Sequence, residues 1–324
     1  MNISNSTFSN ITNKKQVLMD ISQFSIGIVG IIMNLLVCLI FGTHRNLHRP
    51  FNYLLVSLSI SDLVISFSIT FNLFVDILGN SFLSIIGTMI ICKFSYFSGF
   101  TSTCATALTL MVISIERYQA IASMHVQKLK LSSTRKLILI IWMLSAAGAV
   151  IPTIYAGIIL RTYYDCTIAV INIPALIICS ILLSLLCLLP TIAMFALYFI
   201  IIYKLLKTDD SKKLEINSIT ERRQKILRHN ILPIVGISIF SAASTIPYLL
   251  LTGLYLIGNH MNPNFMRLFY AQTGTLYPIS SLFFIICPVI NPLLFNFASR
   301  EYRKSLFSML RCNYPDRIRT NIIT

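Results

Sequence analysis

The sequence has few charged residues. Asp, Glu, Lys and Arg make up 11% of its 324 residues, whereas soluble domains contain about 25%. Hydrophobic residues reach 56%, and the mean hydropathy is +0.77. The shortage of charge excludes an ordinary soluble domain and predicts that most of the chain lies in a bilayer.

Acidic residues are the scarcer of the two charged classes, with 11 against 26 basic residues and a net charge of +15. A nucleic-acid partner is one explanation for such basicity, but the placement of the charges argues against it. If the N-terminus lies outside, 21 of the 26 basic residues fall in segments on the inner side. Inner loops rich in Lys and Arg set the orientation of membrane proteins. The basicity therefore predicts orientation, and we expect no nucleic-acid partner.

Motifs for catalysis and transport are also missing. The sequence contains no His-Glu-x-x-His pair, Gly-x-Ser-x-Gly elbow, phosphate-binding loop or intramembrane carboxylate pair, so we expect no enzyme. It shows no internal repeat, and Asp62 is the only clear charge in the middle of a span. Transporters and channels usually need more of either feature. A transporter remains a remote alternative.

What the sequence does contain is a series of long apolar segments. About 20 residues cross a bilayer as a helix, whereas strands of a membrane barrel need only about 9–11. The fold class predicted is therefore an all-α membrane protein, a seven-transmembrane helix bundle. The predicted spans are Val17–Phe41, Phe51–Leu78, Thr88–Ile115, Leu137–Leu160, Ile171–Ile202, Ile231–Ile257 and Leu268–Phe297.

Three regions follow from this division of the chain. Residues 1–16 are an extracellular N-terminus with glycosylation acceptors at Asn2, Asn5 and Asn10. Residues 17–298 form the seven-span domain, whose first span serves as a signal-anchor in place of a cleaved signal peptide. Residues 299–324 are an amphipathic helix along the inner surface of the lipid bilayer and a cytoplasmic tail.

Three cysteines differ from those in the spans. Cys92 lies at the outer start of the third span and Cys166 in the next outer loop. Both face the oxidising side, where disulfides persist, and we predict that they pair. Cys312 follows the amphipathic stretch and is a candidate for palmitoylation, with an unmodified thiol as the alternative.

A set of short motifs occurs in order, each in its own span. Together they resemble the rhodopsin-like family of G-protein-coupled receptors along nearly the whole chain, and the resemblance is nearest to its peptide-receptor branch. The motifs are Gly30-x-x-x-Asn34, Leu58-x-x-x-Asp62, Glu116-Arg117-Tyr118, Trp142 with Pro152, Pro190 with Tyr198, Pro247, and Asn291-Pro292-x-x-Phe295.

The resemblance implies a switch at the cytoplasmic end. Glu116 restrains Arg117 at rest, and Arg117 turns toward Tyr198 when the receptor activates a heterotrimeric G protein. Tyr118, Asn291, Pro292 and Phe295 belong to the same coupling motifs. The alternative is a plain ion pair at the membrane boundary, which lowers the cost of holding a guanidinium there.

The resemblance also implies a sodium site around Asp62. Asn34, Asn291 and Thr106 would complete an oxygen-rich cluster of the kind that a hard cation requires. A neutral Asp62 in a water network is the alternative. Cys287 stands where the family often has a polar amide, which weakens the expectation of sodium.

Several motifs depart from the family pattern. Thr245 replaces the tryptophan before Pro247, Ser241 the aromatic a turn below, and Phe295 the usual tyrosine, while Leu227 stands where some receptors place an acid. We expect a loosely restrained receptor with measurable basal activity. A receptor-like protein that signals weakly is the alternative.

The ligand is constrained mainly by exclusion. The seventh span has no Lys for retinal, and Gly99 stands where amine receptors place an Asp. A peptide is favoured, with a lipid or a small odorant-like ligand as alternatives, and we expect a receptor in the plasma membrane without a cofactor. The predicted pocket comprises Asp76, Lys93, Phe97, Gly99, Phe100, Tyr248, Thr252, Tyr277 and Ser281.

Overall fold

A computed structural model describes residues 2–44, 47–82, 84–122, 130–160, 164–168, 173–207, 231–261 and 276–310. Cys312 and Leu227 lie outside these ranges. The side chains of four further predicted residues also lie outside the described set: Asn2, Asn5, Asn10 and Asp76.

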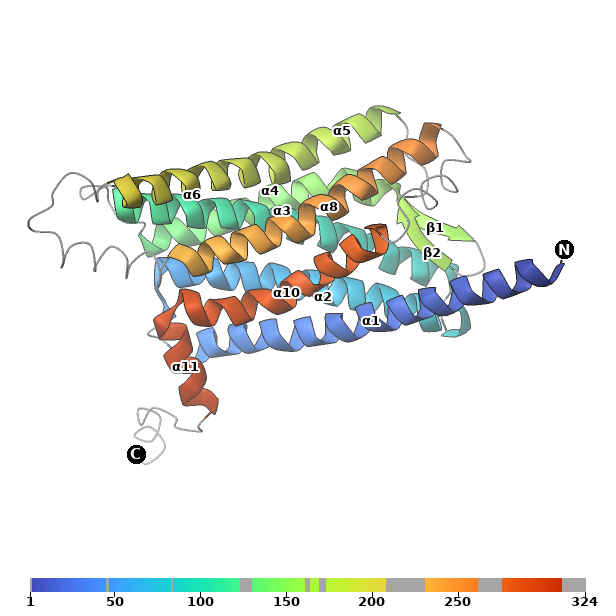
Figure 1. The fold of residues 1–324 in the computed structure, drawn as a ribbon, viewed down its shortest axis with the longest axis horizontal. Helices are drawn as coiled ribbons and strands as arrows, with labels where there is room; N and C mark the ends of the chain where they lie inside the picture. Colours follow the sequence, from blue (N-terminus) through green and yellow to red (C-terminus); the bar gives the residue numbers. More distant parts are fainter. Residues whose placement is uncertain are drawn as a thin grey trace, which may run out of the picture.

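Long helices packed side by side make up the molecule (Figure 1). The described residues contain seven helical stretches long and apolar enough to cross a membrane, which confirms the predicted fold class. The rods are α1 (Asn2–Thr43), α2 (Pro50–Phe82), α3 (Ile85–Ala122), α4 (Leu131–Tyr155), α5 (Ile173–Leu183) continuing through η2 (Ser184–Leu188) into α6 (Leu189–Lys207), α8 (Leu232–Met261) and α10 (Leu276–Ala298).

The fourth span begins and ends earlier along the chain than predicted. Helix α4 ends at Tyr155, and the next residues form strand β1 (Ala156–Leu160), which pairs antiparallel with β2 (Tyr164–Ile168). The prediction that this span continues to Leu160 is therefore wrong. A short apolar run does not distinguish a helix from a strand by periodicity, and here pairing with β2 satisfies its backbone groups.

The closest approach between α1 and α2 depends on glycine. A Cβ atom added at Gly30 would lie 2.6 Å from Oγ of Ser66, and one at Gly27 would collide with Oγ1 of Thr70. Small residues let membrane helices pack closely, where dispersion contacts replace the hydrophobic driving force. This contact explains in physical terms why the first span carries glycine at position 30.

Helix α11 (Arg300–Leu310) turns away from the bundle at the end opposite to the N-terminus (Figure 1). Tyr302 and Leu306 pack against the bundle core, whereas Phe307 is exposed. Burial raises the pKa of Tyr302 to about 12, because desolvation disfavours the phenolate. The helix thus has one side on the bundle and further apolar side chains free to meet lipid.

Candidate functional site

Glu116 and Arg117 lie near the C-terminal end of α3. The Nε atom of Arg117 is 3.2 Å from Oε2 of Glu116, and the side chains are only 17% and 20% exposed. Neither atom has an aligned hydrogen-bond partner within the described part of the chain. The guanidinium carbon of Arg117 also lies 3.6 Å from the ring centroid of Phe51 on α2. Arg117 is therefore held by one carboxylate and one aromatic face.

Tyr198 is held separately on α6. Its side chain is 2% exposed, and its hydroxyl accepts a hydrogen bond of 3.2 Å from Ser238 on α8. Arg117 and Tyr198 are close enough to interact electrostatically, yet each is engaged by another residue. The Tyr198–Ser238 hydrogen bond links α6 to α8, while Arg117 keeps its ion pair with Glu116.

The other residues of the predicted switch have packing partners. The hydroxyl of Tyr118 accepts a hydrogen bond of 3.2 Å from Nζ of Lys204, which also lies 4.9 Å from the ring. Phe295 is fully buried and meets Tyr302 edge-on, with ring centroids 6.5 Å apart. Phe295 thus joins the end of α10 to α11 through apolar contact.

A polar centre lies in the middle of the bundle. Asn291 on α10 donates from Nδ2 to Oδ2 of Asp62 on α2 at 2.8 Å. Asn34 donates from its amide to the carbonyl oxygens of Gly30 and Pro288, at 2.9 and 2.7 Å. These bonds join the first, second and seventh spans across a large sequence separation.

The same centre fits a sodium ion only in part. The amide nitrogen of Asn291, and not its oxygen, faces Asp62, and Thr106 donates to Ser61 at 3.1 Å. The Oδ1 atoms of Asn34 and Asn291 are buried and lack partners among the described residues. Oxygen ligands are thus present. For Asn291 to coordinate sodium together with Asp62, its side-chain amide must rotate so that Oδ1 takes the place of Nδ2. Sodium binding stays a prediction.

Two tyrosines of the predicted ligand pocket belong to one stacked aromatic cluster. Tyr248 stacks on Tyr277 and on Phe284, with ring centroids 6.3 and 4.5 Å apart. One turn from Tyr248, the buried hydroxyl of Thr252 has no hydrogen-bond partner in the described part of the chain. A Cβ atom at Gly99 would meet nothing within 4 Å, so open space adjoins α3 at this level.

Other members of the predicted pocket contact neighbouring helices. Lys93 donates to the carbonyl oxygen of Ile154 on α4 at 3.0 Å, and Ser281 accepts a bond of 3.4 Å from Gln23 on α1. Phe100 stacks on Tyr96 along α3, and Phe97 is half-buried. The structure therefore points Lys93 and Ser281 toward other helices.

A small cavity of about 30 Å³ lies between α3, the η2–α6 segment and α8. None of the eight predicted pocket residues whose side chains the structure describes lines it. Ser241 and Thr245 do, which are the two positions where the sequence has a small hydroxyl in place of an aromatic. The full lining is Thr103, Thr106, Ala107, Leu110, Cys187, Leu188, Thr191, Met194, Ser238, Ser241, Ala242, Thr245, Ile246 and Leu249.

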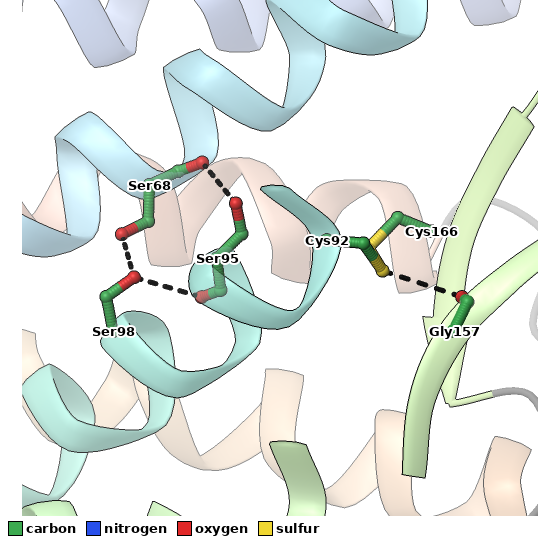
Figure 2. The surroundings of a disulfide bond; sticks show 6 residues. All are labelled: Ser68, Cys92, Ser95, Ser98, Gly157 and Cys166. Atoms are coloured by element: carbon green, nitrogen blue, oxygen red, sulfur yellow. Dashed lines mark hydrogen bonds between the residues drawn. A yellow bond between two sulfur atoms is a disulfide. The ribbon is translucent and has the colours of Figure 1, made fainter. Parts of the chain in front are cut away.

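The predicted disulfide is confirmed. Cys92 and Cys166 are bonded at 2.05 Å, and the bond ties the outer end of α3 to β2. Figure 2 shows Sγ of Cys92 facing the carbonyl oxygen of Gly157 on β1, at 3.5 Å. Just inward, the hydroxyls of Ser68 and Ser98 lie 2.5 Å apart and join α2 to α3.

Sequence reasoning did not find Phe51 and Ser238 as partners of Arg117 and Tyr198. Phe51 precedes Arg117 by 66 positions, and Ser238 follows Tyr198 by 40. No local pattern marks either residue, because each contact depends on how two helices are rotated against each other.

Known proteins share this architecture. Residues 33–295 match the model of the 7 transmembrane receptor (rhodopsin family). Neuromedin-U receptor 2 of Mus musculus is 27% identical over 86% of this chain and 71% of its own length. Growth hormone secretagogue receptor type 1 of Sus scrofa is 26% identical over 90% of this chain and 79% of its own length. Opsin-3 of Mus musculus is 27% identical over 90% of this chain and 71% of its own length. The chain belongs to the rhodopsin family of seven-transmembrane receptors.

Proposed function

We propose that this receptor transmits binding of an extracellular peptide to a heterotrimeric G protein at the plasma membrane. The N-terminus, with glycans on Asn2, Asn5 and Asn10, and the β1–β2 hairpin lie outside. Helix α11 lies at the cytoplasmic surface, followed by a palmitoylated Cys312. Figure 1 shows the hairpin and α11 at opposite ends of the bundle, which supports this orientation.

The arrangement around Arg117 is the observation that carries the proposal. The guanidinium pairs with Glu116 and lies on Phe51, while Tyr198 is bonded to Ser238. Both groups are thus held by non-covalent contacts that can be exchanged for a contact with each other. Release of Arg117 toward Tyr198 would open a cleft between α3, α6 and α8 for the G protein.

The ligand class follows from the relatives and the outer end. Two of the relatives are named as receptors for neuromedin-U and for growth hormone secretagogue, which favours the peptide-receptor branch. The likeness to Opsin-3 is not carried to retinal, since Leu268–Phe297 contains no Lys. Stacked Tyr248 and Tyr277, with the Thr252 hydroxyl beside them, offer an aromatic anchor with a polar group, as peptide recognition requires.

The test is basal activation of the four G-protein α-subunit classes in cells at matched surface expression. We expect wild type to activate at least one class and Arg117→Ala to fall to the level of empty vector. Arg135→Ala is the matched control, because this exposed guanidinium donates to Tyr53 at 2.7 Å, away from Tyr198. Equal activity of wild type and Arg117→Ala contradicts the proposal, and substrate flux insensitive to Arg117→Ala would indicate a transporter.

A further inference from the structure

Two buried thiols face each other between α3 and the fifth span. The Sγ atoms of Cys104 and Cys187 lie 3.3 Å apart, although the residues are 83 positions apart in the chain. Each side chain is 3% exposed. Buried cysteines usually serve as small hydrophobes, but two of them from separate helices in direct contact form a dithiol.

A local irregularity in the fifth span surrounds Cys187. Residues Ser184–Leu188 form a π-helical turn, and the N–H of Leu189 donates to the carbonyl oxygen of Ser184. Pro190 follows and lacks an N–H, and the hydroxyl of Thr191 donates to the carbonyl oxygen of Cys187 at 2.7 Å. The wider turn changes which side chain faces α3. Such π-turns in helices occur frequently at functional sites.

Cys187 also lines the cavity between α3, η2 and α8, whose volume is about 30 Å³. A water molecule needs roughly 10–15 Å³ and two or more polar partners. The hydroxyls of Thr103, Thr191 and Ser241 line the same space. A small polar molecule such as hydrogen peroxide therefore fits next to Cys187, whose thiol contacts that of Cys104.

We propose that Cys104 and Cys187 are an oxidisable dithiol that forms a second disulfide when hydrogen peroxide enters this cavity. The sulfur of Cys187 attacks one peroxide oxygen, the O–O bond breaks, and the displaced hydroxide leaves as water with the thiol proton. Cys187 is then a sulfenic acid. The sulfur of Cys104 attacks the Cys187 sulfur, the S–O bond breaks, and a second water leaves with the Cys104 proton.

Forming a bond between the two sulfurs requires only a small movement of their side chains. A disulfide has an S–S distance of about 2.05 Å, so the sulfurs approach by roughly 1.3 Å from their present contact. The bond would cross-link α3 to η2 within the bilayer, well inward from Cys92–Cys166. It would also fix the π-turn in its present form, because Cys187 is its fourth residue.

The test uses the full-length protein in lipid nanodiscs, treated with graded hydrogen peroxide, alkylated and digested for mass spectrometry. We expect a peptide pair linking Cys104 to Cys187, with two hydrogen atoms lost. The constitutive Cys92–Cys166 pair serves as an internal reference. Cys104→Ser and Cys187→Ser remove the new pair, whereas Cys287→Ser, another buried thiol on α10, keeps it.

A second measurement is the melting temperature, which needs no ligand or G protein. Peroxide should raise the melting temperature of wild type and of Cys287→Ser by several degrees and leave Cys104→Ser unchanged. The proposal is overturned if both thiols remain alkylatable after peroxide. It is equally overturned if they are oxidised singly to sulfinic acids, or if Cys187 links to another cysteine. If a variant fails to fold, the peptide map of peroxide-treated wild type still shows whether Cys104 and Cys187 become linked.

Discussion

The two ends of α3 are held in different ways. At the outer end Cys92 is bonded covalently to Cys166, and Lys93 donates to the end of α4. At the inner end Arg117 has an ion pair with its neighbour Glu116 and lies on the ring of Phe51. One end is fixed by a covalent bond, and the other is held by non-covalent contacts.

The energies explain the division. The disulfide is covalent and typically contributes about 2–4 kcal/mol. The ion pair of Arg117 is largely buried, so separating it without a new partner is costly, but it is non-covalent and can be exchanged for another polar contact. The cation–π contact contributes about 0.5–1 kcal/mol. A rigid outer end and a releasable inner end are what a receptor needs to pass a signal along one helix.

The largest effect should come from breaking the fixed end. Cys166→Ser removes a bond that closes a sequence separation of 74 residues, and we expect a loss of about 2–5 kcal/mol. Surface expression and the melting temperature of the purified protein measure it. Cys38→Ser, a half-buried free thiol on α1, is the control and should change neither. Equal melting temperatures for Cys166→Ser and wild type would contradict the assigned role.

A smaller effect is expected at the inner end from Ser238→Ala. The substitution removes the donor to the Tyr198 hydroxyl, and a hydrogen bond of this type contributes about 1 kcal/mol. Tyr198 becomes free to meet Arg117, so basal G-protein activation should rise about five-fold. Ser244→Ala is the matched control, because its hydroxyl donates to the carbonyl oxygen of Ser241 on the same helix and not to Tyr198. A fall in basal activity would contradict this role of the Tyr198–Ser238 hydrogen bond.

The smallest effect is expected from Phe51→Leu. Leucine keeps apolar packing but has no aromatic face for Arg117, and loss of the cation–π contact should weaken the resting state by about 0.5–1 kcal/mol. Basal activation should rise by about two- to five-fold at low salt and remain responsive to Arg117→Ala. Phe41→Leu is the control, since Phe41 contacts the rings of His48 and Tyr53. Equal responses of the two variants would show that only packing matters.

Sequence reasoning found the fold because each span carries its own signal. Twenty apolar residues must satisfy their backbone hydrogen bonds internally in lipid, so helix follows from composition alone. The signal fails at the membrane boundary. Ala156–Leu160 is as apolar as the helix before it, but its backbone groups pair with β2 outside the bundle.

Contacts between residues close in the chain were predicted better than contacts between residues on different helices. Glu116 and Arg117 are adjacent in the chain, so their ion pair follows from the sequence. Asp62 and Asn291 were expected together, but only the structure shows that an amide nitrogen joins them. The predicted ligand pocket stays a prediction, and the structure adds that Lys93 and Ser281 contact neighbouring helices.

The sequence by itself determined that this chain has seven membrane-spanning segments and that Cys92 and Cys166 pair. These properties sum over local composition and are insensitive to fine geometry. The tertiary structure decided the Tyr198–Ser238 bond, the aromatic face under Arg117, the cavity at Thr245 and the contact of Cys104 with Cys187. Each of these depends on the rotation of one helix about its axis, which close packing against several neighbours fixes.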